Sequence, residues 1–398
     1  MLPTSSIPPL TPRVIIGFLG TWVMALLAAN LVPVLIGALI ADLGMSITAA
    51  SALATAMSLG TAASIFACTK LVAKGDRPRV ARIGLLVMAL GFGVGAATLN
   101  ETAVGIGVVL AGIGAGTVVA AGTAASAATR DPDKTVNIVM IVNRLAAAAL
   151  LAIVPVLGSD LRTILLILTA VGLVGLLAAG GLPNVPIEVA QKPVSGRQFG
   201  IKAIILALVF GLWSMTEDLV YAISGVIGTE YAGMTLEDLS LVLSLSVVGG
   251  LAGALLSPLA LKLLGRSLAI GLIITIGSIC KYLVLTADGS ATLSTGLVVA
   301  GAMYGAVLAL VFALAARMDL SGRVATLVTG VYIVGVALGP VVGGSLIGII
   351  STDALGLAIG IPSLIFGVLL YAVSRASGVA ERGGEIVESV KTQQDAVV

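Results

Sequence analysis

Long apolar runs separated by short polar turns extend along almost the whole chain. Each run is about 20 residues or longer, which is the length that an α-helix needs to cross the hydrocarbon core of a bilayer. The strands of a membrane barrel are shorter and alternate apolar with polar positions, a pattern that these runs do not have. We therefore expect an all-α integral membrane protein with twelve transmembrane helices, at residues 14–41, 47–70, 82–99, 103–128, 135–158, 162–182, 201–228, 238–261, 267–287, 292–316, 323–350 and 353–374.

The composition excludes the main classes of soluble protein. Of the 398 residues, 59% are hydrophobic and 10% are charged, whereas a soluble domain carries about 25% charged residues. The chain contains no histidine, so it has neither a catalytic Ser-His-Asp or Cys-His set nor a histidine metal site. Cys68 and Cys280 stand alone in apolar runs. We expect no enzyme activity, no catalytic residue, no metal and no cofactor.

The basic residues indicate the orientation of the helices. If the N-terminus is cytoplasmic, 18 of the 21 Lys and Arg fall in cytoplasmic segments, and only Arg144, Arg162 and Lys281 do not. This is the bias of the positive-inside rule, so we expect a multi-pass protein of the cytoplasmic (inner) membrane with both termini in the cytoplasm. Contact with anionic membrane lipid accounts for these residues, and no nucleic acid partner is expected.

The two halves of the chain repeat each other. Residues 44–46 (Gly-Met-Ser) and 233–235 (Gly-Met-Thr) each stand between the first and second helix of a half, and Arg77 and Arg266 both open the next basic turn. We expect a monomer that consists of a cytoplasmic N-terminus (1–13), an N-terminal six-helix bundle (14–182), a cytoplasmic linker (183–200), a C-terminal six-helix bundle (201–374) and a disordered cytoplasmic tail (375–398).

Three stretches resemble motifs of the major facilitator superfamily. The stretch Gly335-Val-Ala-Leu-Gly339-Pro340-Val-Val-Gly343-Gly344 resembles its GxxxGPxxGG pattern, and Gly112-Ile-Gly114-Ala-Gly116 resembles its glycine-rich fourth helix. The basic turns at residues 74–79 and 264–266 are similar to the signature after helices 2 and 8. The resemblance covers about residues 13–375 and assigns no subfamily, since Val72 and Lys262 stand where the signature has aspartate.

This resemblance implies twelve helices in two pseudo-symmetric six-helix bundles that rock around a central solute site. It also implies that helices 1, 4, 7 and 10 line the cavity. A nucleotide-binding loop at residues 112–116 is excluded, because that stretch lies inside an apolar run. Small residues let helices approach closely, so we expect packing or gating roles for Gly112, Gly116, Gly335, Gly339, Pro340, Gly343 and Gly344.

Arg144 is the first candidate for solute binding. It lies ten residues beyond Lys134, which is roughly 15 Å into a hydrocarbon core of about 30 Å. An ionisable group at this depth is costly and is a functional candidate by default. Arginine can hold a carboxylate or phosphate through two parallel hydrogen bonds. The alternative is a structural charge pair within the bundle.

Two adjacent carboxylates are candidates for proton coupling. Glu217 and Asp218 lie 15 and 16 residues beyond Lys202, past the expected midplane. Adjacent helical residues point about 100° apart, so one of them can bind a proton or pair with Arg144 while the other faces a neighbouring helix. We favour Glu217, and the alternative is an interfacial position for both. Lys281 is interpreted as a lysine that snorkels to the outer interface.

Other polar and aromatic residues at comparable depths are candidates for the solute pocket. Asn30 and Tyr221 stand at similar depths in helices 1 and 7, and two tryptophans lie below them. Helix packing is the alternative interpretation for each residue. The full candidate set for solute binding is Arg144, Asn30, Trp22, Trp213, Tyr221, Tyr304 and Tyr332.

These residues predict a secondary active transporter that moves a small solute by alternating access with protons as the coupling ion. Because Arg144 is the only cation expected near the midplane, we favour symport of a small organic anion. The alternative is a drug/proton antiporter that exports amphipathic or cationic compounds, although only 4% of the residues are aromatic. A receptor that binds solute without moving it is a further alternative, which a flux assay would distinguish.

Overall fold

The computed structural model describes residues 10–73, 75–130, 132–184, 200–318 and 323–379. Within these ranges the chain contains helices and turns, and twelve helical segments are long and apolar enough to cross a membrane. The predicted all-α fold with twelve spans is therefore confirmed. Most of the predicted linker (185–199) and the predicted tail beyond residue 379 lie outside the described ranges.

The helices follow one another along the chain with short turns between them. The N-terminal half contains α1 (Pro12–Phe18), a π-helical turn (Leu19–Val23), α2 (Met24–Asn30), α3 (Val32–Leu43), α4 (Ile47–Ala73), α5 (Arg77–Thr98), α6 (Glu101–Ser126), α7 (Pro132–Leu157), α8 (Leu161–Ala178) and a 3-10 turn (Ala179–Gly181). The C-terminal half contains α9 (Ile201–Val226), a π-helical turn (Ile227–Tyr231), α10 (Leu236–Leu264), α11 (Arg266–Leu285), α12 (Ser290–Met318), α13 (Arg323–Leu346) and α14 (Thr352–Ala376).

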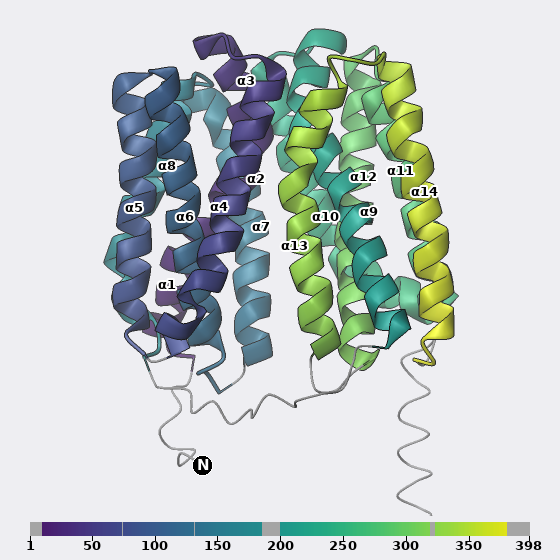
Figure 1. Ribbon diagram of the computed structural model, residues 1–398, viewed down its shortest axis with the longest axis horizontal. Coiled ribbons are helices and arrows are strands. Elements are labelled where there is room, and N and C mark those ends of the chain that lie inside the picture. The colour runs from purple at the N-terminus through teal and green to yellow at the C-terminus, as the bar shows by residue number, and fades with distance from the viewer. Residues whose placement is uncertain (1–9, 74, 131, 185–199, 319–322, 380–398) are drawn as a thin grey trace, which may run out of the picture.

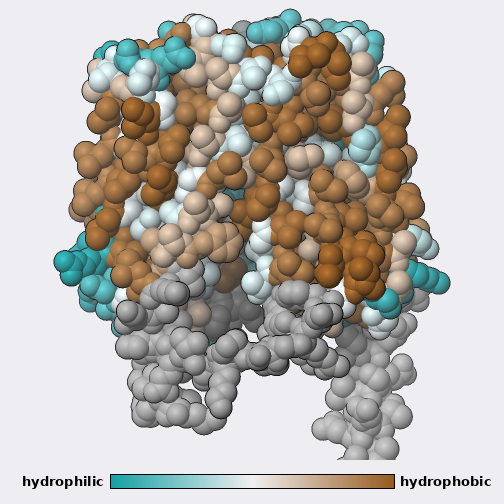
Figure 2. Space-filling view, in the orientation of Figure 1, coloured by the Kyte–Doolittle hydropathy of each residue, from teal (hydrophilic) through white to brown (hydrophobic). Residues whose placement is uncertain are grey.

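The two halves stand side by side with their helices roughly parallel (Figure 1). We call the end at which α1 and α9 begin the linker end, and the opposite end, where α3 lies, the far end. On the face shown in Figure 2, an apolar belt crosses the middle of the molecule. Side chains such as Leu177 and Phe66, 88% and 65% exposed, contribute to this surface. So large an apolar surface is unfavourable in water and suits the hydrocarbon of a bilayer.

The first span is interrupted, whereas the sequence predicted one continuous helix over residues 14–41. A π-helical turn occupies Leu19–Val23, and α2 ends at Asn30. Leu31 leaves the helical conformation, with φ −94° and ψ 4°. Pro33 follows in the first turn of α3. Because proline has no N–H and its ring crowds the preceding turn, it suits a new helix start better than the interior of a longer helix.

Helix α5 begins at Arg77 rather than at residue 82. Asp76 precedes it with a left-handed φ of 60°, and Pro78 stands in its first turn. The Arg77 side chain is fully buried and donates to the backbone carbonyls of Val72 (3.3 Å) and Pro183 (3.2 Å). The apolar pattern missed this first turn because its arginine is buried by the local fold rather than exposed in a loop.

Among the described residues, four hydrogen bonds join the two halves, and all of them lie toward the far end. Tyr221 Oη donates to the Asn30 carbonyl (2.7 Å), and Ser244 Oγ donates to the Ala148 carbonyl (2.7 Å). Between α4 and α13, Thr48 Oγ1 donates to the Gly344 carbonyl (3.0 Å) and Thr55 Oγ1 accepts from the Val341 N–H (3.0 Å). The described contacts therefore close the molecule at the far end.

Glycines of α13 allow it to pack against two helices. A Cβ on Gly339 would lie 2.7 Å from the backbone nitrogen of Leu219, and one on Gly344 would lie 2.2 Å from Ser51 Oγ. Distances this short leave no room for a side chain. Within the same helix, Gly335 and Gly343 also pack against α9, and Pro340 lies inside the helix.

Glycines of α6 contact α4 in the same way. A Cβ on Gly112 would lie 2.2 Å from the Met57 carbonyl oxygen, and one on Gly116 would lie 2.1 Å from the Thr61 carbonyl oxygen. Close approach of the two backbones also brings Thr61 Oγ1 within 3.0 Å of the Gly112 carbonyl. The position of these glycines inside a helix is consistent with packing and not with a phosphate-binding loop.

Candidate functional site

Arg144 lies where the two halves meet. It projects from α7 and is partly buried, and its Nη1 donates to Asn30 Oδ1 at 3.4 Å. The Asn30 amide nitrogen donates to the Leu26 carbonyl at 2.9 Å, which directs Oδ1 toward the guanidinium. The Cζ atom of Arg144 lies 6.0 Å from the ring centroid of Tyr304, which belongs to the opposite half. Among the described contacts, only one of its five N–H donors is engaged, so the others are available to an anion.

The break in the first span brings a backbone acceptor to the same place. Asn30 is the last residue of α2, and its carbonyl accepts the hydroxyl of Tyr221 from α9. Backbone groups freed by a helix break inside a membrane need a partner. Asn30 therefore contacts Arg144 through its side chain and Tyr221 through its backbone, and it connects the two halves next to the arginine.

An aromatic cluster lies on the C-terminal side of Arg144. The hydroxyls of Tyr304 and Tyr332 are hydrogen-bonded to each other. Trp213 stacks on Tyr304 with 5.9 Å between ring centroids, and Phe210 stacks on both Trp213 and Tyr332 at 5.4 Å. Phe312 completes the cluster edge-on to Phe210. Only 4% of the residues are aromatic, and the fold gathers five of them into one cluster that reaches Arg144 through Tyr304.

Trp22 lies elsewhere. Its ring centroid is 6.4 Å from that of Phe18, and it packs against Gly122 of α6. The structure thus brings together six of the seven residues that the sequence nominated for solute binding. It gives Trp22 a packing position within the N-terminal half.

Glu217 pairs with Lys281 rather than with Arg144. Lys281 Nζ lies 2.7 Å from Glu217 Oε1, and the lysine is fully buried. The interpretation of Lys281 as a snorkelling residue is therefore wrong. Its ammonium points into the C-terminal half, where it also contacts Thr216 Oγ1 (3.1 Å) and Ser363 Oγ.

Asp218 faces a different direction from its neighbour. It is partly buried and packs against Gly339 of α13, where an added Cβ would lie 2.9 Å from Asp218 Cβ. Within the described part of the chain its carboxylate makes no hydrogen bond or ion pair. Asp218 and Arg144 both interact electrostatically with Tyr221, Tyr304 and Tyr332. The unpaired acid and the arginine therefore lie near the same three tyrosines.

The family of this chain follows from a match over most of its length. The model of the Major Facilitator Superfamily matches residues 17–328. The chain belongs to this superfamily. It is a multi-pass membrane protein and a secondary transporter of a small-molecule solute rather than an enzyme, and its two six-helix halves have the architecture that the sequence predicted.

Solved structures of superfamily transporters share this fold. The nucleoside transporter NupG aligns with a TM-score of 0.69 at 15% identity, covering 91% of this chain and 99% of its own. A bacterial homologue of the human lysosomal transporter Spinster aligns with a TM-score of 0.66 at 13% identity, and the alignment covers 92% of this chain and 98% of the homologue. The human organic anion transporter MFSD10 aligns with a TM-score of 0.64 at 16% identity, and the alignment covers 91% of this chain and 100% of MFSD10. No curated protein matches the chain. Transporters of different solutes share this fold, so the fold does not identify the solute of this protein, and the residues of the site must indicate it.

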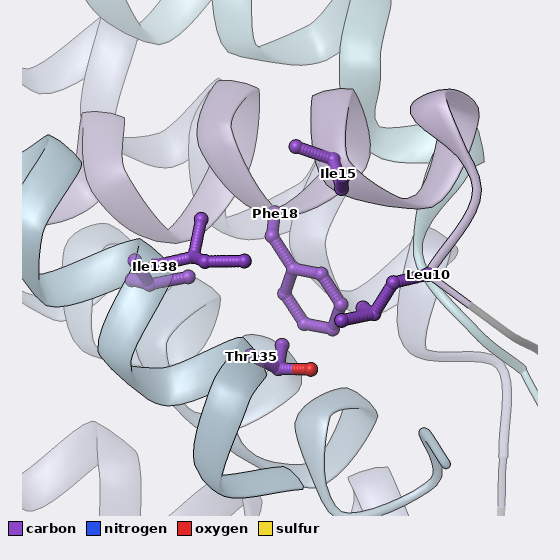
Figure 3. Close-up of a pocket in the computed structure, with 6 residues that line it drawn as sticks. Leu10, Ile15, Phe18, Thr135 and Ile138 are labelled. Atoms are coloured by element: carbon purple, nitrogen blue, oxygen red, sulfur yellow. The ribbon is translucent and has the colours of Figure 1, made fainter. Parts of the chain in front are cut away.

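A small apolar pocket between α1 and α7 is a poor candidate for the solute site of this superfamily member. Figure 3 shows the ring of Phe18 between Leu10 and Ile15 on one side and Thr135 and Ile138 of α7 on the other. Its volume of about 10 Å³ would hold at most one water molecule. Among the described residues, no group of three His, Cys, Asp or Glu side chains is placed to hold a metal ion.

Lys281 is the site residue that sequence reasoning missed. Its depth was a usable signal, because Lys281 lies 15 residues beyond Arg266 at the start of α11 and Glu217 lies 16 residues beyond Ile201 at the start of α9. Both helices run from the linker end toward the far end, so the two residues stand at the same level. Which faces of α9 and α11 meet could not be read from either apolar run.

Proposed function

We propose that the protein is a proton-coupled symporter of small organic anions. The observation that carries this proposal is Arg144, a guanidinium with free donors at the junction of the two halves, beside three tyrosine hydroxyls. A carboxylate would accept two parallel hydrogen bonds from it. The hydroxyls of Tyr304 and Tyr332 bond to each other, so one of them keeps a proton for a further solute oxygen, and the second amide N–H of Asn30 could donate to another.

The proton requirement rests on the acidic pair of α9. Glu217 and Asp218 are carboxylates within a membrane span, a position where charge is costly and where proton relays are built.

Trp213 supports a polar occupant of the site, since its Nε1 is buried without a hydrogen-bond partner among the described residues. A bound solute or water would satisfy this donor.

The orientation and gating complete the proposal. The positive-inside bias supports cytoplasmic termini in the inner membrane, which places the linker end in the cytoplasm. The hydrogen bonds between the halves lie toward the far end, so we infer that the solute path in this conformation opens toward the cytoplasm. We propose that the two six-helix bundles (14–182 and 201–374) rock as units, in a monomer surrounded by lipid, with the glycines of α6 and α13 as packing and gating positions.

Proteoliposomes with a pH dye inside test this function. We would add a panel of hydroxylated and dicarboxylic anions that do not cross protein-free liposomes. Acidification of the lumen by one of them is the expected result. Arg144→Lys should weaken the apparent affinity about 10- to 100-fold, because charge-assisted hydrogen bonds contribute about 1.5–3 kcal/mol. Wild-type kinetics in a folded Arg144→Lys variant would contradict the role of Arg144.

A drug/proton antiporter is the second candidate function. The aromatic cluster of Phe210, Trp213, Tyr304, Phe312 and Tyr332 favours it, because stacked rings bind lipophilic cations. The same liposomes distinguish the two functions. Proton efflux from acid-loaded vesicles on addition of a lipophilic cation, with silence toward every anion, would support the antiporter and leave Arg144 a structural residue.

A further inference from the structure

Lys281 is a fully buried cation of the C-terminal half to which the proposed function gives no role. Its ammonium has three donors. Three oxygens surround it: Glu217 Oε1 at 2.7 Å, Thr216 Oγ1 at 3.1 Å and Ser363 Oγ. The ring of Trp213 lies 5.5 Å from Nζ. These contacts come from α9 and α14, so the fold has built a complete polar enclosure for this one charge.

This enclosure determines the protonation state of Glu217. A buried carboxylate at hydrogen-bond distance from an ammonium is stabilised in its charged form, and removal of either partner would leave an uncompensated charge in a low-dielectric interior. Proton binding to Glu217 would leave Lys281 in that situation. Glu217 is thus poorly suited to bind and release a proton in each transport cycle.

Asp218 has the opposite surroundings. The titratable groups near it are Glu217 and Tyr221 on its own helix, Tyr304 on α12 and Tyr332 on α13. The nearest cations lie beyond these groups, Lys281 of α11 against Glu217 and Arg144 of α7 over the ring of Tyr304. None of them makes an ion pair or hydrogen bond with its carboxylate in the described part of the chain. Gly339, which packs against Asp218 from α13, has no side chain that could supply a counter-ion.

We infer that Lys281 is a positioning residue that keeps Glu217 permanently charged, so that Asp218 is the carboxylate that carries the proton. This inference rests on the proposed proton symport. The four charges Lys281⁺, Glu217⁻, Arg144⁺ and Asp218⁻ sum to zero. Protonation of Asp218 changes the sum to +1, and a bound monoanion returns it to zero. With Lys281 the protonated site carries +1 and attracts the anion. Without Lys281 the protonated site would sum to zero, this attraction would be lost, and a bound monoanion would bring the sum to −1.

Infrared spectroscopy on the purified full-length protein tests the assignment without a known solute. The C=O stretch of a protonated, buried carboxylic acid is recorded on acidification, and variant spectra are subtracted from wild type to cancel the exposed carboxylates. We expect this band to disappear in Asp218→Asn and to persist in Glu217→Gln/Lys281→Met, which removes the pair without leaving a lone charge. Loss in the double variant with persistence in Asp218→Asn would overturn the inference, as would the absence of the band in wild type.

Two single variants separate positioning from packing. In Lys281→Met, Glu217 loses its counter-ion, so a second carboxylic acid band should appear on acidification. In Lys281→Arg it should be absent, because the positive charge is kept. A purely structural lysine would produce no difference between the two spectra, and that result would also overturn the inference. If Lys281→Met does not fold, the double variant and Lys281→Arg still decide the assignment.

The outcomes of the infrared experiment are independent of those of the liposome assay that tests the proposed function. A band that belongs to Asp218 without any carboxylate-driven acidification in liposomes would refute anion symport and leave the assignment of the titrating acid intact. Acidification by a carboxylate together with a band that belongs to Glu217 would support symport and refute the role given to Lys281.

Discussion

The hydroxyl of Tyr221 donates a 2.7 Å hydrogen bond to the backbone carbonyl of Asn30, across the boundary between the two halves of the protein. The acceptor is available because α2 ends at Asn30 and Pro33 starts a new helix. One bond therefore joins the broken first span to α9 next to Arg144, whose guanidinium contacts the same asparagine. A solute that binds Arg144 would be positioned to disturb this connection.

Loss of the Tyr221 hydroxyl should loosen the closed far end. A hydrogen bond contributes about 1 kcal/mol net, so Tyr221→Phe should reduce the ratio of closed to open molecules by about fivefold. Tyr371→Phe, at an exposed position of α14, is the matched control and should have no effect. The efficiency of a disulfide between Ala148→Cys and Ser244→Cys at the far end would measure the change, and an unchanged efficiency in Tyr221→Phe would contradict the prediction.

A disulfide across the far end should lock the transporter. Ser244 Oγ lies 2.7 Å from the Ala148 carbonyl, so Ala148→Cys and Ser244→Cys, in a protein without Cys68 and Cys280, should form a disulfide readily. Flux should stop on oxidation and return on reduction, because alternating access requires the halves to separate there.

The control pair for this cross-link lies on the same two helices. Asn137→Cys and Leu255→Cys stand about three turns nearer the linker end, on the same faces of α7 and α10. Both positions are exposed, so thiol labelling should find little disulfide. Equal cross-linking of both pairs would show that the halves also meet at the linker end, against the inferred open path.

Substitution of Gly339 should separate α13 from α9. Gly339→Ala places a Cβ 2.7 Å from the Leu219 backbone and 2.9 Å from Asp218, and overpacking of this kind costs about 1–3 kcal/mol. Gly330→Ala in the same helix meets nothing within 4 Å and should keep the wild-type melting temperature. Thermal unfolding in detergent compares the two variants, and equal melting temperatures would mean that α13 accommodates the extra methyl group.

Neutralisation of Lys281 should destabilise the protein more than removal of the whole pair. Lys281→Met leaves Glu217 buried without a counter-ion, and breaking a buried pair on one side costs about 3–5 kcal/mol. The double variant Glu217→Gln/Lys281→Met should recover much of this loss. Lys262→Met removes an exposed lysine of α10 and serves as the control. If melting temperatures fall further in the double variant than in Lys281→Met, the pair is not held together by charge.

Properties that repeat along the chain were readable in the sequence. The twelve spans, the two-half repeat and the packing glycines follow from local hydropathy and residue size, since a bilayer demands the same length and apolarity of every span. Arg144 stood out because an arginine deep in an apolar run is costly wherever the helix is placed. The superfamily match confirms the fold that these patterns implied.

Which faces of distant helices meet was decided only by the tertiary structure. Lys281 was assigned to the lipid interface from its position in the chain, and the fold buries it against Glu217 on another helix. At the break near Leu31, Tyr221 of the opposite half satisfies the exposed carbonyl of Asn30, a partner that the local sequence does not reveal. An apolar run determines that a helix crosses the membrane. The partner of each polar side chain depends on how helices far apart in the sequence pack, and charges buried there are stable only where that packing supplies a partner.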